Sequence, residues 1–156
     1  MQQLLIEVIS DNEEGRFERW VDALLAGDIE TFGSELNEYS LQAPSFLDTG
    51  GMHKEQFYHG LLLGLLAYLR GSYQVSSNHE SGLGRYDIAL FPLDTRKQGV
   101  ILELKAAKED EDLQALAMAA KAQIAEKGYV REMESRGITN ILTLGISFCG
   151  KTAVVV

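Results

Sequence analysis

The sequence predicts an α/β (α+β) fold in which a mixed central β-sheet is flanked by helices. Two observations lead to this prediction. Apolar residues recur at helical spacing in the first 70 residues, and short apolar segments bounded by Gly, Pro or Asp follow from residue 72 onward. One helical segment separates the third of these short segments from the last two. Runs of strands and helices in this order are typical of a mixed sheet covered by helices.

Length and composition fit one compact domain. The chain has 156 residues, of which 46% are hydrophobic, and only two prolines. Its one cysteine, Cys149, excludes an internal disulfide framework and a cysteine-rich zinc site. Because no apolar run is long enough to cross a bilayer and the first residues lack the order of a signal peptide, we expect a cytoplasmic protein with no membrane partner.

Two helices are expected in the first fifty residues. The first ends at Gly27, and Asp28 begins the second. The apolar face of the first helix consists of Phe17, Trp20, Val21, Leu24 and Leu25. We therefore expect an N-terminal helical extension over residues 1–50, which either supports the core or offers an interaction surface, and a second unit over residues 51–156.

The second unit begins with a helix over about residues 53–70 that is apolar almost all round, with Glu55 and His59 on one face. Three strands are expected next, in "SYQVSSNHE", "RYDIALFP" and "GVILELKA". A helix over residues 109–127 follows, because its acidic first residues suit the positive end of a helix and Gly128 closes it. The segments "NILTLGISF" and "TAVVV" predict two final strands.

Two opposite charges interrupt the apolar strand "VILELKAA". Residues two apart in a strand point to the same face, so Glu103 and Lys105 project together while Leu102 and Leu104 fill the other side. A buried carboxylate needs a partner. Asp87 in the preceding strand is the candidate, since a hairpin would bring the two carboxylates side by side. Such a pair favours Mg²⁺, which prefers oxygen ligands. The competing interpretation is a surface ion pair on an edge strand.

These residues resemble the signature of the PD-(D/E)XK nuclease superfamily, which is an acidic residue on one strand followed by Glu, any residue and Lys on the next. The blocks "FYHGLLLGLLAYL", "SGLGRYDIALFP", "ILELKAAK" and "QIAEKGY" are similar, in the same order, to a bacterial subgroup whose nuclease-like domain follows an AAA-ATPase-like domain. The resemblance runs from about Glu55 to the end of the chain. One departure is Tyr86, which stands where the family name has proline.

The resemblance implies a restriction-endonuclease-like core over residues 51–156 and Mg²⁺ (or Mn²⁺) as the cofactor. It implies that Asp87, Glu103 and the main-chain carbonyl of Leu104 are metal ligands, and that Lys105 is the catalytic base or a charge stabiliser. By the same similarity, Glu55 is an auxiliary acid and Gln123 positions the lysine, water or phosphate. An ATPase-like domain or protein is the implied partner.

The expected function is therefore a metal-dependent phosphodiesterase, a DNA or RNA nuclease that uses a metal-activated water. Arg85 and Lys127 are candidate substrate contacts. The alternative is a catalytically inactive regulatory or interaction domain attached to an AAA-ATPase-like protein. The formal net charge of -9 favours that alternative, because phosphate affinity comes largely from Lys and Arg. Three charges kept in an apolar sheet favour the enzyme.

A second motif, "GISFCGKT" from Gly145 to Thr152, satisfies the P-loop pattern. A working P-loop needs a helix directly afterwards, whose N-terminal amides hold the phosphates. Only "AVVV" remains, and four residues of which three are β-branched cannot supply that helix. We therefore interpret Gly150 as a turn between two terminal strands.

Overall fold

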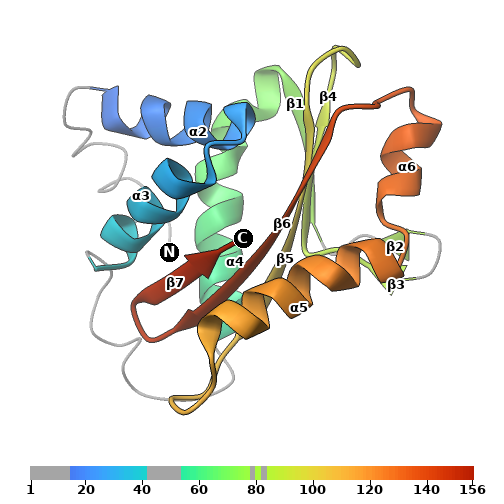
Figure 1. Cartoon of the computed structure of the whole chain (residues 1–156). Helices are drawn as coiled ribbons and strands as arrows, with labels where there is room; N and C mark the ends of the chain where they lie inside the picture. The colour runs from blue at the N-terminus through green and yellow to red at the C-terminus, as the bar shows by residue number, and fades with distance from the viewer. Residues whose placement is uncertain (1–14, 42–53, 78–79, 82–83) are drawn as a thin grey trace.

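A computed structural model of the chain describes residues 15–41, 54–77, 80–81 and 84–156 (Figure 1). A five-stranded mixed sheet forms its centre, with the strand order β1-β4-β5-β6-β7. Its strands are β1 (Tyr73–Ser77), β4 (Ile88–Pro92), β5 (Gly99–Ala106), β6 (Ile141–Cys149) and β7 (Thr152–Val155). The central pair β5 and β6 is parallel, and the other neighbours are antiparallel. The predicted mixed sheet with flanking helices is confirmed.

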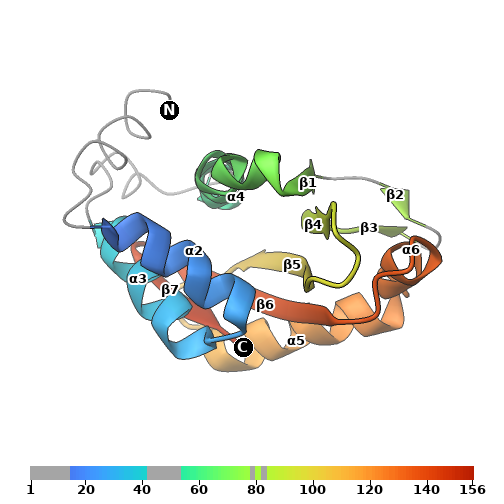
Figure 2. The ribbon, with the colours of Figure 1, turned by 90° about the horizontal axis from the view of Figure 1, so that it is seen from above.

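Helices cover both faces of this sheet. The described helices are α2 (Arg16–Ala26), α3 (Ile29–Leu41), α4 (Lys54–Leu66), α5 (Leu113–Glu126) and α6 (Val130–Ser135). Seen from above, α4 lies on one side of β5 and β6, and α5 lies on the other (Figure 2). A 3₁₀ helix, η3 (Ala67–Gly71), joins α4 to β1, and a two-stranded ribbon of β2 (Glu80–Ser81) and β3 (Gly84–Arg85) lies beside the main sheet.

Alternation along β5 divides the interior into two cores. Leu102 and Leu104 belong to a large cluster with residues of α2, α3 and α4, whereas Ile101 belongs to a smaller cluster with Ile124 of α5 and Met133 of α6. This is the period of two expected for a central strand buried on both faces. The sheet therefore holds the charged face of β5 against α5.

The N-terminal helices share the larger core. Trp20 is fully buried, stacks on Phe32 at a centroid distance of 4.9 Å and donates its indole N–H to the Phe32 carbonyl. On α3, Asn37 bridges to the last strand, accepting from the Ala153 N–H and donating to its carbonyl, both at 2.8 Å. These contacts anchor α3 on β7. The division at residue 50 stays a prediction.

Several predicted boundaries are shifted. The helix expected over residues 109–127 begins at Leu113, because the Asp112 carboxylate accepts from the N–H groups of Gln114 and Ala115 and caps it there. The helix expected over residues 53–70 ends at Leu66 and continues as η3. Asp87 was expected inside a strand, but it lies in a bend directly before β4. None of the helices among the described residues is long and apolar enough to cross a membrane.

Candidate active site

Glu103 lies near the middle of the sheet. It belongs to β5, which has β4 on one side and β6 on the other, and it is 4% exposed. Within the described ranges it is the one charged residue in the buried class, beside the two serines Ser40 and Ser147. Because β5 is a central strand, the interpretation of a surface ion pair on an edge strand is wrong. A buried carboxylate in this place is costly unless neighbouring groups stabilise it.

Two side chains reach the Glu103 carboxylate. From α5, Gln123 donates its side-chain amide N–H to Glu103 Oε1 across 2.5 Å. From two residues further along β5, the Lys105 ammonium lies 3.9 Å from the same oxygen, with its side chain 36% exposed. Lys105 therefore lies between the buried carboxylate and the solvent at the end of β5. Because the Lys105 side chain is partly exposed, its ammonium is accessible to a ligand, although the Glu103 carboxylate is buried.

Asp87 lies next to this pair in the register of the sheet. The ladder between β4 and β5 ends with Ile88 opposite Leu102, and one further step would place Asp87 opposite Glu103 on the same face. Asp87 Oδ2 accepts the main-chain N–H of Leu104 at 2.8 Å. The Asp87 carboxylate thus accepts the hydrogen bond that a main-chain carbonyl of β4 would accept if the pairing with β5 continued. The bend that removes Asp87 from β4 makes this contact possible.

Leu104 faces Asp87 with its main chain. In a strand the N–H and C=O of one residue point to the same side, as they do when two residues exchange both bonds. Because the Leu104 N–H points to Asp87, its carbonyl points to the same side of β5, beyond the end of the ladder to β4. Asp87, Glu103 and the Leu104 carbonyl are therefore oxygen donors around the same end of two strands.

His59 of α4 approaches Asp87 from the opposite face of the sheet. Its Nε2 atom lies 3.1 Å from the Asp87 carbonyl oxygen and 3.1 Å from Ser77 Oγ at the end of β1. The sequence predicted only that His59 shares one helical face with Glu55, and it gave no partner for His59. His59 fixes the main chain of Asp87, and the Leu104 N–H fixes its side chain.

Burial raises the pKa of the Asp87 carboxyl above its usual value of 3.8. The hydrogen bond from the Leu104 N–H opposes this change, and so do the nearby His59 and Lys105. The direction shows that desolvation outweighs these three favourable neighbours. A cation at this carboxylate would offset the cost of burying its charge.

The remaining predicted residues are placed less completely. Glu55 lies in α4 and Arg85 in β3, but their side chains are outside the described residues. Lys127 follows the last residue of α5, is exposed and donates its main-chain N–H to the Gln123 carbonyl. Of the predicted site, the structure brings together Asp87, Glu103, Leu104, Lys105 and Gln123.

Comparison with known proteins identifies the family of the chain. A model of the PD-(D/E)XK nuclease superfamily matches residues 53–156, two thirds of the chain. The chain belongs to the PD-(D/E)XK nuclease superfamily. The mixed five-stranded sheet with its flanking helices is consistent with the restriction-endonuclease-like fold of this superfamily. No curated protein and no solved structure matches the chain.

The donor set fits the divalent cation that the superfamily typically uses. In the part of the chain that the structure describes, no group of three or more His, Cys, Asp or Glu side chains is placed to hold a metal ion. Asp87 and Glu103 supply two carboxylates, and Mg²⁺ is commonly bound by one or two carboxylates together with waters and substrate phosphates. Hard oxygen donors without sulfur or clustered imidazole suit Mg²⁺ or Mn²⁺ better than zinc.

The P-loop pattern has a structural explanation in this PD-(D/E)XK chain. Its residues form the end of β6, a turn and the start of β7, and the two strands pair antiparallel with Cys149 opposite Thr152. Gly150 has a φ of 58°, a left-handed conformation that favours glycine. Tyr58 of α4 donates its hydroxyl to the Gly150 carbonyl at 2.6 Å. The interpretation of Gly150 as a turn between two strands is confirmed.

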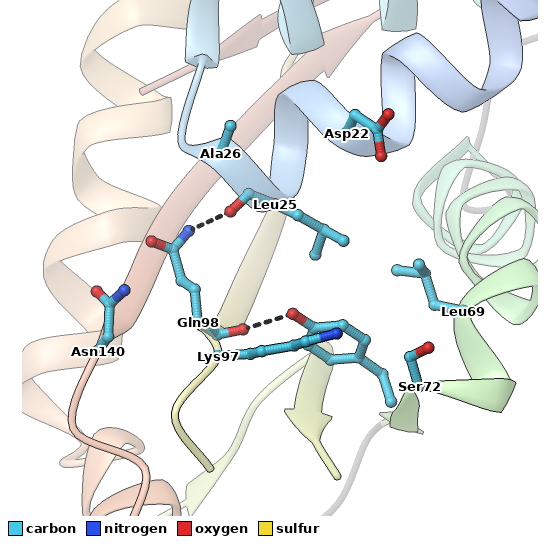
Figure 3. A pocket seen from close by; sticks show the side chains of 9 residues that line it. Asp22, Leu25, Ala26, Leu69, Ser72, Lys97, Gln98 and Asn140 are labelled. Atoms are coloured by element: carbon cyan, nitrogen blue, oxygen red, sulfur yellow. Dashed lines mark hydrogen bonds between the residues drawn. The ribbon is translucent and has the colours of Figure 1, made fainter. Parts of the chain in front are cut away.

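A separate hollow of about 610 Å³ lies at the other end of β5, where α2 meets the loop before the strand (Figure 3). Gln98 forms part of its wall, donating to the Leu25 carbonyl and accepting from the Tyr73 hydroxyl. The hollow contains none of the predicted catalytic residues. The cluster of Asp87, Glu103 and Lys105 lies at the opposite end of β5.

Proposed function

We propose that this PD-(D/E)XK protein is a metal-dependent phosphodiesterase that cleaves DNA or RNA. The single observation that carries the proposal is the buried Glu103 carboxylate, which has the Lys105 ammonium 3.9 Å away. A central strand would gain stability from an apolar residue at this position. The charge is therefore better explained by chemistry than by folding.

Asp87, Glu103 and the Leu104 carbonyl would hold the cation. When bound, Mg²⁺ or Mn²⁺ would supply Lewis-acid chemistry, polarising the phosphodiester and making water easier to deprotonate. Gln123 would keep the Glu103 carboxylate in one orientation through its 2.5 Å hydrogen bond. The Leu104 N–H does the same for Asp87. Both carboxylates are thus oriented before any ligand binds.

Lys105 would carry the second part of the chemistry. Its ammonium lies at the exposed end of the pair, where it can orient the attacking water through a hydrogen bond and stabilise negative charge that develops on the phosphoryl oxygens. Arg85 and Lys127 are proposed to contact the nucleic-acid backbone. An ATPase-like domain or protein remains the proposed partner, on the similarity of the four sequence blocks to the ATPase-linked subgroup.

Cleavage assays test this function directly. Plasmid DNA, single-stranded DNA and RNA would be incubated with the protein and Mg²⁺ or Mn²⁺. We expect cleavage by the wild type and a rate at least about 100-fold lower for Asp87→Ala and for Lys105→Ala, the order of magnitude supplied by positioned acid–base groups. Lys97→Ala is the matched control, because Lys97 is an exposed lysine before the opposite end of β5. Absence of cleavage, or equal cleavage by all variants, would exclude the proposal.

A further inference from the structure

Gly145 of β6 lies beside Glu103 in the sheet. The two residues are register partners in the parallel pair of β5 and β6, so side chains at these positions leave the same face about 4.8 Å apart. That face is covered by α5, which lies along β6 (Figure 2). Because Gly145 has no side chain, the surface of the sheet is lower here, next to the buried carboxylate.

The main chain of α5 fills the space that a side chain at position 145 would need. A Cβ atom built on Gly145 would lie 1.9 Å from the Ala117 carbonyl oxygen and 2.6 Å from the Lys121 nitrogen. Both atoms belong to the helix backbone and cannot rotate away as a side chain would. At Gly71, by contrast, an added Cβ meets nothing within 4 Å. A side chain at 145 is therefore incompatible with the present height of α5 above the sheet.

Main-chain hydrogen bonds hold β6 in place on both of its edges. Gly145 exchanges two main-chain hydrogen bonds with Val156, of 3.1 and 3.0 Å, on the side of β6 away from β5. With β5 pairing on its other edge, β6 is held on both sides. Relief of the clash would thus lift α5. Raising a 1.9 Å contact to an ordinary 3.4 Å requires a movement of up to about 1.5 Å.

Such a movement would reach the candidate active site. Gln123 is only two residues beyond Lys121 on α5, and its amide N–H spans 2.5 Å to Glu103 Oε1. Lengthened by about 1.5 Å, this distance would exceed the range of a hydrogen bond. We propose that Gly145 is a positioning residue: by allowing the backbone of α5 to touch β6, it places the Gln123 amide on the Glu103 carboxylate. This inference rests on the proposed nuclease function.

The first test compares cleavage rates in a double-mutant cycle. Gly145→Ala should lower the rate of divalent-metal-dependent cleavage by about 10–100-fold, the usual effect of losing a residue that orients a metal ligand. In a Gln123→Ala background the same change should cost less than about twofold, because its target is already absent. Gly71→Ala, the same chemical change in open space, should leave the rate unchanged. Equal losses from Gly145→Ala in both backgrounds would overturn the inference.

A second measurement does not depend on activity. In nitrogen-15 NMR spectra the side-chain amide of Gln123, assigned by its absence in Gln123→Ala, should shift toward the position of a solvated amide in Gly145→Ala and stay in place in Gly71→Ala. An unmoved Gln123 signal in a folded Gly145→Ala protein would overturn the inference even if cleavage is observed. A shifted signal in a protein without nuclease activity would support the positioning and reject the proposed function.

If Gly145→Ala does not fold, Ala117→Ser gives the same test with a milder change. Ala117 is fully buried on α5, and its main-chain carbonyl is the group nearest to the Cβ position of Gly145, so an atom added at residue 117 increases the volume between α5 and the rest of the core. We expect a shifted Gln123 signal and a loss of cleavage that disappears in the Gln123→Ala background. An unmoved signal, or a loss that persists in that background, would contradict the proposal.

Discussion

Asp87 is the residue where stability and the proposed chemistry oppose each other. Burial raises the pKa of its carboxyl above the usual 3.8. When folding raises the pKa of a group, the folded state binds the proton more tightly than the unfolded state does. The resulting stabilisation is complete at a pH below the pKa of the unfolded state, and it is lost as the pH rises through the pKa of the folded state. At pH 7 the ionised Asp87 therefore destabilises the metal-free protein. Metal binding reverses the effect, since it stabilises the charged form.

We predict that Asp87→Asn raises the melting temperature of the metal-free protein at pH 7 and leaves it nearly unchanged at pH 3. The asparagine oxygen can still accept the Leu104 N–H, so the effect comes from the lost charge. At a hundred times its dissociation constant, Mn²⁺ should stabilise the wild type by about 2.7 kcal/mol and the variant by much less. Differential scanning fluorimetry at the two pH values, with and without Mn²⁺, measures both effects.

Asp94→Asn is the matched control for this prediction. The hydrogen bond from the Arg96 side chain lowers the pKa of the half-buried Asp94 to about 2, so its carboxylate favours the folded state at pH 7. Removing it should not raise the melting temperature. An Asp87→Asn protein that is less stable than the wild type at pH 7 without metal would contradict the direction given for Asp87.

The sequence predicted the strand that carries Glu103 and Lys105 better than the contacts around it. The E-x-K spacing predicted that Glu103 and Lys105 project together from one strand, because alternation in a strand is a local property, and the structure shows the two side chains 3.9 Å apart. The contact of His59 with Asp87 depends on how α4 crosses the sheet. The residues around Ser77 in the sequence do not indicate that it contacts His59. Gly145 appeared only as part of a false P-loop. Its role depends on the helix above it, which local sequence does not describe.

Among the elements, α5 positions Gln123 and begins at a defined cap. Asp112 Oδ1 accepts from two N–H groups of the first turn, at 2.9 and 3.2 Å. We predict that Asp112→Ala lowers the free energy of unfolding by about 1 kcal/mol, the usual value of such a cap. Urea denaturation measures the change. Asp110→Ala is the control, because Asp110 lies in the preceding turn, outside the helix. Equal effects of the two substitutions would exclude the cap.

The predicted elements were correct where an apolar pattern extends over several residues. The prediction missed a short helix and misplaced the start of a helix that is capped locally. The five strands of the sheet and the helices α2 to α5 follow the apolar pattern. The six-residue helix α6 was not predicted, since among its residues only Met133 is buried and no period can be detected. The start of α5 was placed early, because acidic residues suit both the first turn and the turn before it.

At the scale of the whole molecule, the N-terminal helices and the sheet share one core. Trp20, the single tryptophan, is fully buried in the cluster that also contains Leu102 and Phe148. We predict that Trp20 fluorescence and far-UV circular dichroism report the same unfolding midpoint, as expected for a cooperative unit. Separate midpoints would show that residues 1–50 form an independent extension, which is the division expected from the sequence.

The charge of the molecule limits how it binds nucleic acid. A net charge of -9 repels phosphates at long range, so binding depends on a few lysines and on a cation near the site. With few phosphate contacts, affinity should fall only weakly with salt concentration. A bound cation is therefore central to the proposed function, because the two carboxylates and the substrate phosphates would all contact it.

Calorimetric titration with Mn²⁺ tests most directly whether Asp87 and Glu103 bind a divalent cation. We predict one site in the wild type, and affinity at least about 10-fold weaker in both Asp87→Asn and Glu103→Gln, with Glu126→Gln on the exposed face of α5 unchanged. No measurable binding to the wild type, or equal binding by all four proteins, would contradict the claim that Asp87 and Glu103 hold a divalent cation.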